Sequence, residues 1–317
     1  MSKKVLPFRD VFDSFQVLQP TSNERLQNFV SSKDKNKQTD LKEQDAINSL
    51  MSELNHLIGL NNVKSLVNEI LAFADIQQER RDQGLNAMPL VLHMIFKGNP
   101  GTGKTTIARL LGKILKLKGY LSSGHIIEVE RADLVGEYIG HTAQKVRDQI
   151  KKGMGGILFI DEAYSLARGG EKDFGKEAID ALVKGMEDYK NDIILILAGY
   201  KEEMENFLQI NPGLMSRFPI HIEFNDYTLE ELVEIAELMV SEREYILAKS
   251  SKAKLYNILA LQRSRGGLHS GNARLVRNLI ERGIRKQAVR LKNKKYYSRD
   301  ELMTLMKDDF TDNDLTP

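Results

Sequence analysis

The sequence contains no cysteine. This absence excludes disulfide bonds, thiolate metal sites and cysteine nucleophiles, and it agrees with a reducing compartment, so we expect a cytoplasmic protein. The sequence also lacks any apolar run that approaches the roughly 20 residues of a membrane-spanning helix. Its first residues hold two lysines but no continuous apolar core of the kind that secretory signals have. We therefore expect no membrane anchor.

The chain also carries little net charge, +2 at pH 7 over 317 residues. This balance gives no argument for a nucleic acid partner. The charge is uneven towards the end of the chain, because residues 274–299 hold ten Lys or Arg against one acid, and residues 300–317 hold six acids against one lysine. A solvated surface is the simplest interpretation, and a contact face for a neighbouring subunit or a partner is the alternative.

The length suggests about two domains. Residues 1–40 lack sustained periodicity and include a polar, lysine-rich stretch, which predicts a flexible N-terminal arm. From residue 41 apolar side chains return at helical spacing. A second helix is predicted after the segment IGLNN, with an apolar stripe formed by Val63, Leu66, Val67, Ile70, Leu71 and Ala74.

Five apolar segments predict strands that alternate with helical stretches. They lie at residues 91–96, 125–130, 156–160, 192–198 and 220–224. Strands that alternate with helices of ten or more residues are typical of a parallel, doubly wound sheet with helices on both faces. We therefore expect an α/β domain over residues 41–226.

The strand patterns stop after Tyr227. Thr228 and Glu231 resemble a capping box that opens a helix, and further helical patterns follow at residues 255–261, 272–291 and 299–306. We expect a smaller, all-helical domain over residues 227–308 and an acidic tail over residues 309–317. The chain has no internal repeat of fixed period.

A glycine-rich turn separates the first predicted strand from a helix. Gly98, Gly103, Lys104 and Thr105 fit the pattern G-x-x-x-x-G-K-[ST], in which backbone N–H groups surround a phosphate and the lysine reaches the β- and γ-phosphates. The threonine hydroxyl would bind Mg²⁺. Glycine suits such a turn because the backbone approaches the ligand closely and some positions need a positive φ.

Two carboxylates follow the third predicted strand. Asp161 and Glu162 come directly after four apolar residues, so they are expected at the carboxyl edge of the sheet, where α/β folds bind ligands. Asp161 would hold Mg²⁺, mainly through water, and Glu162 would polarise an attacking water. Phosphoryl transfer needs such positioning because its transition state spreads negative charge over several oxygens.

These motifs together resemble an AAA+ ATPase. The segments GNPGTGKT, ILFIDEAYS, NPGLMSRF and GNAR carry the resemblance, which covers about residues 41–308. The segments HMIFKGNPGTGKTT, LVGEYIGHTA and ILILAGY are similar to those of the group that includes red-type rubisco activases and the stage V sporulation protein K type. The residues of these segments and the overall chain length resemble the sporulation type more. The resemblance implies the P-loop AAA+ fold with a helical lid, bound ATP and Mg²⁺, and a ring, usually a hexamer.

The resemblance also implies roles for residues outside the two motifs. Arg217 in LMSRFP would be the arginine finger that reaches the γ-phosphate on the next subunit, and a surface loop arginine is the alternative. Arg274 in GNAR would be the sensor 2 residue of the lid. The segment Ile58 to Leu60 would hold adenine. Tyr200 occupies the sensor 1 position, where a smaller polar residue is usual, and its hydroxyl could orient the water.

Two segments resemble the loops that face the central pore of such rings. Tyr138 belongs to an aromatic–aliphatic–glycine loop, YIG, that would grip a polypeptide, although such a tripeptide alone is more often core or turn. Residues 168–175 would form a second pore loop.

The resemblance thus implies a Mg²⁺-dependent ATPase that assembles into a homo-oligomeric ring and remodels a protein client at its pore, with a role in sporulation. An ATP-dependent switch or scaffold, or a chaperone of the rubisco activase type, is the alternative. A DNA-acting motor would rest on the basic segment 274–299 alone, since no DNA-binding domain is evident after the lid.

Overall fold

The computed structural model describes residues 44–87, 91–138, 140–168, 173–190, 192–265, 271–292 and 294–311. The predicted arm, residues 1–40, and residues 312–317 of the predicted acidic tail lie outside these ranges. The geometry below concerns the compact unit Ser49–Pro317. Within the described ranges, no helix combines the length and the apolar character that a membrane crossing requires.

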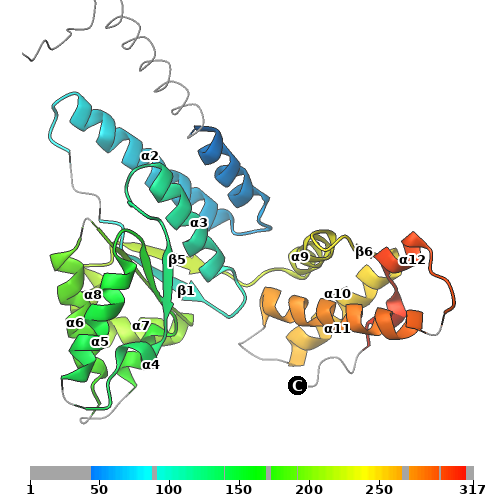
Figure 1. Ribbon diagram of the computed structural model, residues 1–317. Helices are drawn as coiled ribbons and strands as arrows, with labels where there is room; N and C mark the ends of the chain where they lie inside the picture. Colours follow the sequence, from blue (N-terminus) through cyan, green and yellow to red (C-terminus); the bar gives the residue numbers. More distant parts are fainter. Residues whose placement is uncertain are drawn as a thin grey trace, which may run out of the picture. The chain divides into compact units, whose positions relative to one another are not determined.

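A five-stranded parallel sheet forms the centre of the α/β domain (Figure 1). The strand order is β2-β3-β4-β1-β5, and each strand lies within a few residues of a predicted one. The non-consecutive neighbours require crossovers, which the helices between the strands provide. The strands are β1 (Met94–Gly98), β2 (Ile126–Val129), β3 (Ile157–Ile160), β4 (Ile194–Gly199) and β5 (Ile220–Phe224).

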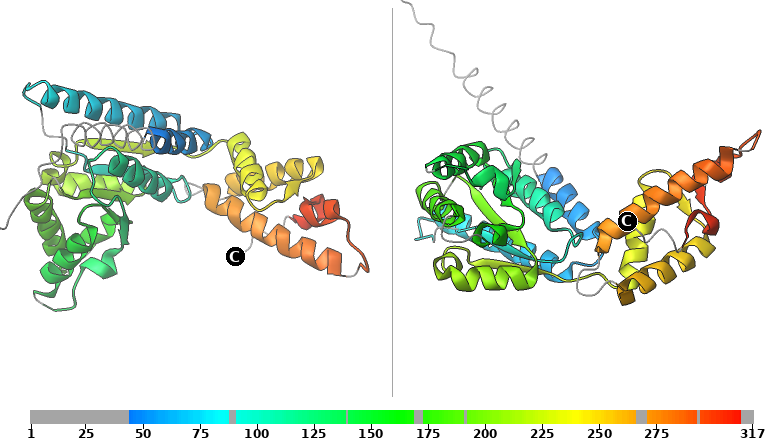
Figure 2. Two further views of the ribbon diagram at one scale, coloured as in Figure 1. Left: turned by 45° about the horizontal axis from the view of Figure 1, so that its top comes forward. Right: turned by 90° about the horizontal axis from the view of Figure 1, so that it is seen from below.

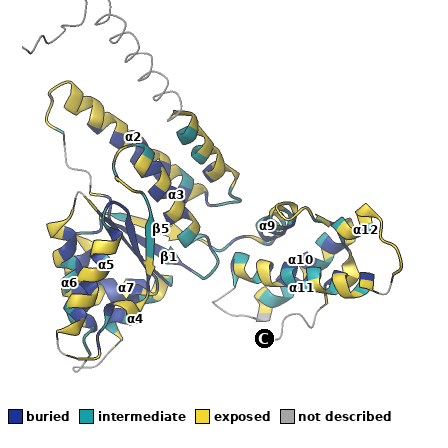
Figure 3. Ribbon diagram, viewed as in Figure 1, coloured by how far each residue is buried: buried dark blue, intermediate teal, exposed yellow. Residues whose placement is uncertain are grey.

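Alternate residues of each central strand enter different cores. Met94 and Phe96 of β1 pack with α2 (Asn61–Asp82) and α3 (Lys104–Leu117). Ile95, between them, packs on the opposite face. Because both faces are covered, the central strands are apolar at nearly every position and are dark blue in Figure 3, whereas the outer sides of the helices are yellow.

The opposite face is covered by three helices, α5 (His141–Gly153), α6 (Gly175–Asp188) and α7 (Lys201–Ile210). Shorter elements connect these helices to the strands. They are α4 (Arg131–Leu134), α8 (Pro212–Met215) and the 3₁₀ helix η1 (Ala163–Ala167).

The helix that follows β5 begins with the capping box that the sequence predicts. Thr228 accepts a hydrogen bond from the backbone of Glu231 and the Glu231 carboxylate accepts one in return, which confirms the capping box at the start of α9 (Leu229–Ser241). This helix packs against α10 (Lys249–Arg265) and α11 (Asn272–Lys292), as Figures 1 and 2 show. Their apolar faces join the core that also contains α2 and α3.

Where the structure describes it, the lid is helical except for a short parallel pair that the sequence analysis did not predict. Strands β6 (Ile246–Leu247) and β7 (Thr304–Leu305) pair within the lid. The predicted helix over residues 299–306 therefore ends at Met303, as α12 (Arg299–Met303), before the 3₁₀ helix η2 (Lys307–Asp309).

Tertiary contacts explain this early helix end. Leu305 is fully buried, and its carbonyl oxygen accepts hydrogen bonds from the Ser251 hydroxyl at 2.8 Å and the Ala248 amide at 3.1 Å. The side-chain amide of Gln287 donates to the carbonyl oxygen of Thr304. These partners are distant in sequence, so local periodicity carried no sign of them.

Candidate functional site

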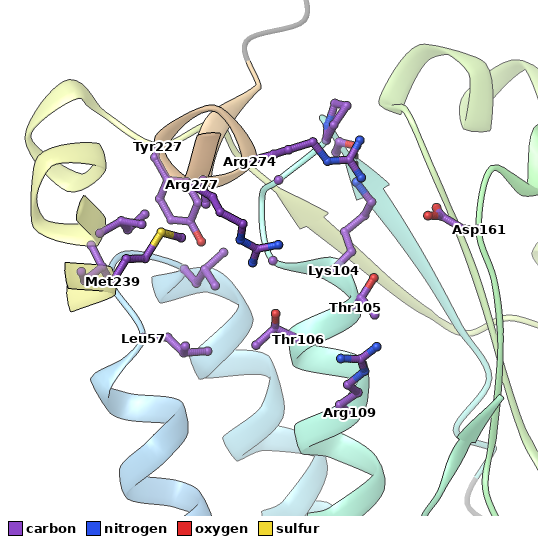
Figure 4. A pocket seen from close by; sticks show the side chains of 18 of the residues that line it. Leu57, Lys104, Thr105, Thr106, Arg109, Asp161, Tyr227, Met239, Arg274 and Arg277 are labelled. Atoms are coloured by element: carbon purple, nitrogen blue, oxygen red, sulfur yellow. Dashed lines mark hydrogen bonds between the residues drawn. The ribbon is translucent and has the colours of Figure 1, made fainter. Parts of the chain in front are cut away.

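A cavity of about 510 Å³ lies at the carboxyl edge of the sheet, between the glycine-rich turn and the lid (Figure 4). It brings together many of the sequence-predicted site residues. These are Ile58, Leu60, Gly98, Gly103, Lys104, Thr105, Asp161, Glu162, Tyr200 and Arg274.

The glycine-rich turn has the backbone geometry that its sequence predicts. Gly101 and Gly103 have φ values of +74° and +97°, which L side chains rarely adopt. A Cβ atom on Gly101 would also lie 2.5 Å from the carbonyl oxygen of Gly271 and 2.7 Å from the Arg274 amide. Helix α3 begins at Lys104, so its N-terminal end is adjacent to the turn, where it favours an anion.

Lys104 is held inside this turn. Its ammonium group donates to the carbonyl oxygens of Gly98 at 2.7 Å and Asn99 at 2.9 Å. Burial lowers its pKa to about 8, and the neighbouring positive charge of Arg274 acts in the same direction, while Asp161 opposes both. The group therefore remains largely protonated at neutral pH, and a bound polyphosphate would relieve the repulsion from Arg274.

The two carboxylates stand at the end of β3. Asp161 accepts a hydrogen bond from the Glu162 amide at 2.9 Å. Glu162 has a φ of +46°, an uncommon conformation for a residue with a side chain, and one that is frequent at functional sites.

The donor set of the cavity fits Mg²⁺ together with a nucleotide. Thr105 and Asp161 offer a hydroxyl and a carboxylate oxygen, and both line the cavity. Among the residues described, no three His, Asp or Glu side chains form a cluster able to hold a metal. Mg²⁺ commonly binds through one or two protein oxygens, with substrate phosphates and water completing its shell.

Tyr200 follows the end of β4 and lines the same cavity. Its ring lies 5.8 Å from the ring of Tyr164, which in turn lies beneath the Arg168 guanidinium at 4.5 Å. Burial, with the neighbouring Glu162 and Tyr200, raises the pKa of Tyr164. The aromatic pair thus packs Tyr200 against the 3₁₀ helix η1, which follows Glu162.

The other end of the cavity is apolar. Ile58 and Leu60 line it, as do Tyr227 and Met239. The Tyr227 hydroxyl donates to the Thr102 carbonyl oxygen at 3.2 Å, and burial raises the pKa of this hydroxyl to about 12. One end of the cavity can therefore accept a flat apolar group, and the other end, with the Lys104 ammonium and the start of α3, is suited to anions.

Asn272, which the sequence analysis did not select, connects the glycine-rich turn to the lid. It is 1% exposed and has a φ of +43°. Its amide group donates to the Pro100 carbonyl oxygen at 3.3 Å and to Asp226 at 2.8 Å, and its oxygen accepts from the Tyr227 amide at 3.1 Å. Asn99 also donates to both Asp226 oxygens at 3.0 Å. A polar network therefore forms the junction between the two domains.

A second missed residue is Arg277, which lines the cavity one helical turn after Arg274. Sequence signals for these residues exist in retrospect. Asn272 is part of the GNAR segment itself, and Arg277 has the i+3 spacing that repeats one face of a helix.

Arg217 lies away from this cavity. Its guanidinium pairs with Glu187 at 2.7 Å and donates to the Gly213 carbonyl oxygen at 2.8 Å. It precedes β5, whose register with β1 puts it at the amino edge of the sheet, while the glycine-rich turn follows the carboxyl edge. The strand from Ile220 to Phe224 alone spans about 13 Å.

Tyr138 is 65% exposed in the loop before α5. The base of this loop is fixed, because the buried Thr142 hydroxyl accepts a hydrogen bond from the Gly136 amide at 3.0 Å. The Tyr138 ring meets the ring of His141 edge-on at 5.5 Å. Ile139, between Tyr138 and Gly140, lies outside the described residues.

The second predicted pore loop is described in part, since residues 169–172 lie outside the described ranges. Asp173, directly after them, pairs with Arg131 at 2.5 Å, which holds the pKa of Asp173 below its usual value. Arg131 also donates to the Ser165 carbonyl oxygen at 2.5 Å. This end of the predicted loop is thus tied to the 3₁₀ helix that follows Glu162.

Comparisons with known proteins bear directly on this arrangement. Residues 94–226 match the model of the ATPase family associated with various cellular activities (AAA), and residues 228–316 match the AAA lid domain. The crystal structure of the FIGL-1 AAA domain in complex with ADP is similar, with a TM-score of 0.54 at 16% identity and coverage of 80% of each chain, a likeness of fold.

Two relatives are much more similar in sequence. The stage V sporulation protein K of Bacillus subtilis (strain 168) is 54% identical over 266 residues, which cover 84% of this chain and 83% of that protein. The chloroplastic ribulose bisphosphate carboxylase/oxygenase activase of Cyanidioschyzon merolae (strain NIES-3377 / 10D) is 44% identical over 279 residues, which cover 84% and 90%. The resemblance read from the motifs is confirmed, and the chain belongs to the AAA family of ATP-hydrolysing enzymes, with an AAA domain followed by an AAA lid.

Proposed function

We propose that this ATPase works as a ring motor, usually of six subunits, that remodels a protein client at its pore. One observation carries the proposal: Lys104, Thr105, Asp161 and Glu162 share a cavity, while Arg217 stands at the other edge of the sheet. Such a chain holds most of an ATPase site and needs a second copy to complete it.

In the proposed site each residue has a separate task. The amides of the turn and the Lys104 ammonium bind the β- and γ-phosphates, with Lys104 exchanging its carbonyl partners for phosphate oxygens. Thr105 and Asp161 would hold Mg²⁺, which when bound neutralises charge on the phosphate oxygens. Glu162 polarises the attacking water, and Tyr200 orients it through its hydroxyl.

Arg217 acts on the neighbouring subunit in this proposal. The register of β5 with β1 keeps it far from the turn of its own chain. Its side chain is 38% exposed, so a second copy can reach it. A guanidinium brought to a transferring phosphoryl group contributes on the order of 10³-fold in rate. To do so, Arg217 must exchange Glu187 for the phosphate, a change that assembly would cause.

Tyr138 supports work on a polypeptide. An exposed aromatic ring on an anchored loop gives large contact area at small entropic cost and without sequence preference. The 54% identity to a protein named for sporulation supports a role in spore formation. In a cytoplasmic ring of this kind the client would be a protein, and nucleic acid is not required.

Particle mass tests the assembly. We expect the Glu162→Gln protein, which binds ATP without hydrolysing it, to form a ring with ATP and smaller species without nucleotide. The matched control is Glu202→Gln, an exposed glutamate on α7, which should assemble as the unchanged protein does. A monomer under both conditions would leave Arg217 without a target and would contradict the proposal.

A further inference from the structure

We propose that Arg277 binds the part of the nucleotide between the base and the terminal phosphates, namely the ribose and the α-phosphate. It would then set affinity for nucleotides in general, in contrast to Arg274. The inference rests on the proposed nucleotide site.

Arg277 and Arg274 share one face of α11. They are three residues apart, a spacing that puts side chains above one another on a helix, and both line the cavity. In Figure 4 the two side chains extend from α11 to different parts of the cavity. Arg274 lies over Lys104, and Arg277 extends between Lys104 and the apolar end marked by Tyr227 and Met239.

The two ends of the cavity fix the order of the ligand's parts. A base fits the apolar end near Tyr227 and Met239, and the terminal phosphates fit beside Lys104 and Asp161. The sugar and the first phosphate must then lie between the two ends. Arg277 extends into this middle part, and its planar fork of donors suits a phosphate or a pair of hydroxyls.

The state of the Arg277 side chain supports this role. It is exposed to the cavity, and across the described part of the chain it forms no ion pair or hydrogen bond. Arg290, further along the same helix, is instead bound to Asp309 at 2.8 Å. Arg277 is thus available for a ligand. Glu242, at the end of α9, also lines the cavity and is a competing partner for Arg277.

Binding of ATP and of ADP separates Arg277 from Arg274. Both nucleotides carry the ribose and the α-phosphate. Arg277→Ala should therefore lower the affinities for ATP and for ADP by a similar factor of about 10 to 100, as expected for the loss of a charged hydrogen bond. Arg274→Ala, which removes a contact to the terminal phosphate, should weaken ATP more than ADP. The measurement is calorimetric titration of each nucleotide, with Mg²⁺, into the Glu162→Gln protein carrying each change.

Arg285→Ala is the matched control, because Arg285 is an exposed arginine of the same helix that is not among the cavity-lining residues. It should leave both affinities unchanged. Arg277→Lys keeps the positive charge but loses the planar array of donors. Its nucleotide affinities should therefore lie between those of the unchanged protein and those of Arg277→Ala. Thermal melting of each variant tests whether the fold is retained.

Three results would decide against Arg277. Unchanged affinities in Arg277→Ala would mean that Arg277 is solvated or pairs with Glu242, and that it does not bind the nucleotide. A loss of affinity for ATP alone would indicate that Arg277 contacts the γ-phosphate. If the parent protein binds neither nucleotide, the proposed site itself fails and this inference falls with it.

Discussion

The two sides of the cavity at the carboxyl edge of the sheet are built in different ways. The α/β side consists of a turn and strand ends whose form follows from adjacent residues, such as Gly103 before Lys104 and Asp161 after β3. The lid side is positioned by hydrogen bonds between residues far apart in sequence, with Asn272 joining Pro100, Asp226 and Tyr227. The first side is therefore expected to keep its form alone, and the second to depend on the junction.

The largest effect is expected on the α/β side. Glu162→Gln should retain ATP binding and lower turnover by about 10²- to 10⁴-fold, because it removes the base that polarises water and leaves the phosphate contacts in place. Steady-state phosphate release and nucleotide titration measure the two properties. Glu202→Gln should leave both unchanged. Hydrolysis at the unchanged rate in Glu162→Gln would refute the role given to this carboxylate.

The junction itself can be broken at Asn272. Asn272→Ala should lower the free energy of unfolding by about 3 kcal/mol, since it leaves buried polar partners unpaired and forces alanine into a left-handed conformation. Asn272→Gly relieves the backbone but not the hydrogen bonds, so it should recover about 1 kcal/mol of this loss. Urea unfolding measures both changes.

The cooperativity of unfolding gives a second test of the junction. We expect Asn272→Ala to unfold in two steps, because the lid would lose its tie to the α/β domain. Asn278→Ala, at an exposed position of the same helix, should unfold as the unchanged protein does. A single transition of unchanged midpoint in Asn272→Ala would mean that the network does not hold the junction.

A buried histidine of the α/β domain lies directly before β1. His93 is buried, accepts a hydrogen bond from the Leu195 amide at 3.1 Å, and has its pKa lowered by burial to about 4. Between pH 6.5 and 4 the unfolded chain binds a proton that the folded chain does not, so stability falls as the pH falls. From pH 7 to pH 5 this histidine should lower the free energy of unfolding by about 2 kcal/mol.

His93→Asn should remove this part of the pH dependence, because asparagine can accept the same hydrogen bond without titrating. Urea unfolding at pH 7 and pH 5 measures it. His56→Asn, at an exposed histidine, is the control and should keep the slope of the unchanged protein. Equal slopes for His93→Asn and the unchanged protein would show that His93 has the same pKa in the folded and the unfolded chain, and would contradict this account.

The smallest effect on ATP hydrolysis is expected at Tyr138, outside the cavity. Tyr138→Ala should leave basal turnover within about twofold, since surface substitutions away from the site change little. A ring motor should nevertheless lose the ATP-driven unfolding of a fluorescent protein that carries an unstructured tail. Tyr138→Phe should retain this work. Equal unfolding by Tyr138→Ala would favour a nucleotide-dependent switch that recruits partners without pulling on them.

The sequence was most informative where structure is local. The apolar runs predict all five strands of the main sheet within a few residues, and the glycine pattern predicts positive φ values in the turn, as found at Gly101 and Gly103, because neighbouring residues alone determine both. The predicted helix over residues 299–306 was too long, because α12 ends at Met303. Ser251 and Gln287, which are distant in sequence, donate hydrogen bonds to the backbone of the residues that follow. The role of Asn272 was not predicted for the same reason, because its hydrogen-bond partners are distant in sequence. The roles of the cavity residues, of Arg217 and of Tyr138 stay predictions.

The central claim is that each ATPase site is shared between two copies of the chain. Mixing Lys104→Ala chains with Arg217→Ala chains tests it most directly, with phosphate release as the readout. Each variant alone should be inactive, and an equal mixture should recover activity at about a quarter of the interfaces, since each heterologous contact joins two different surfaces. No recovery in the mixture, or full activity of Arg217→Ala alone, would contradict the account.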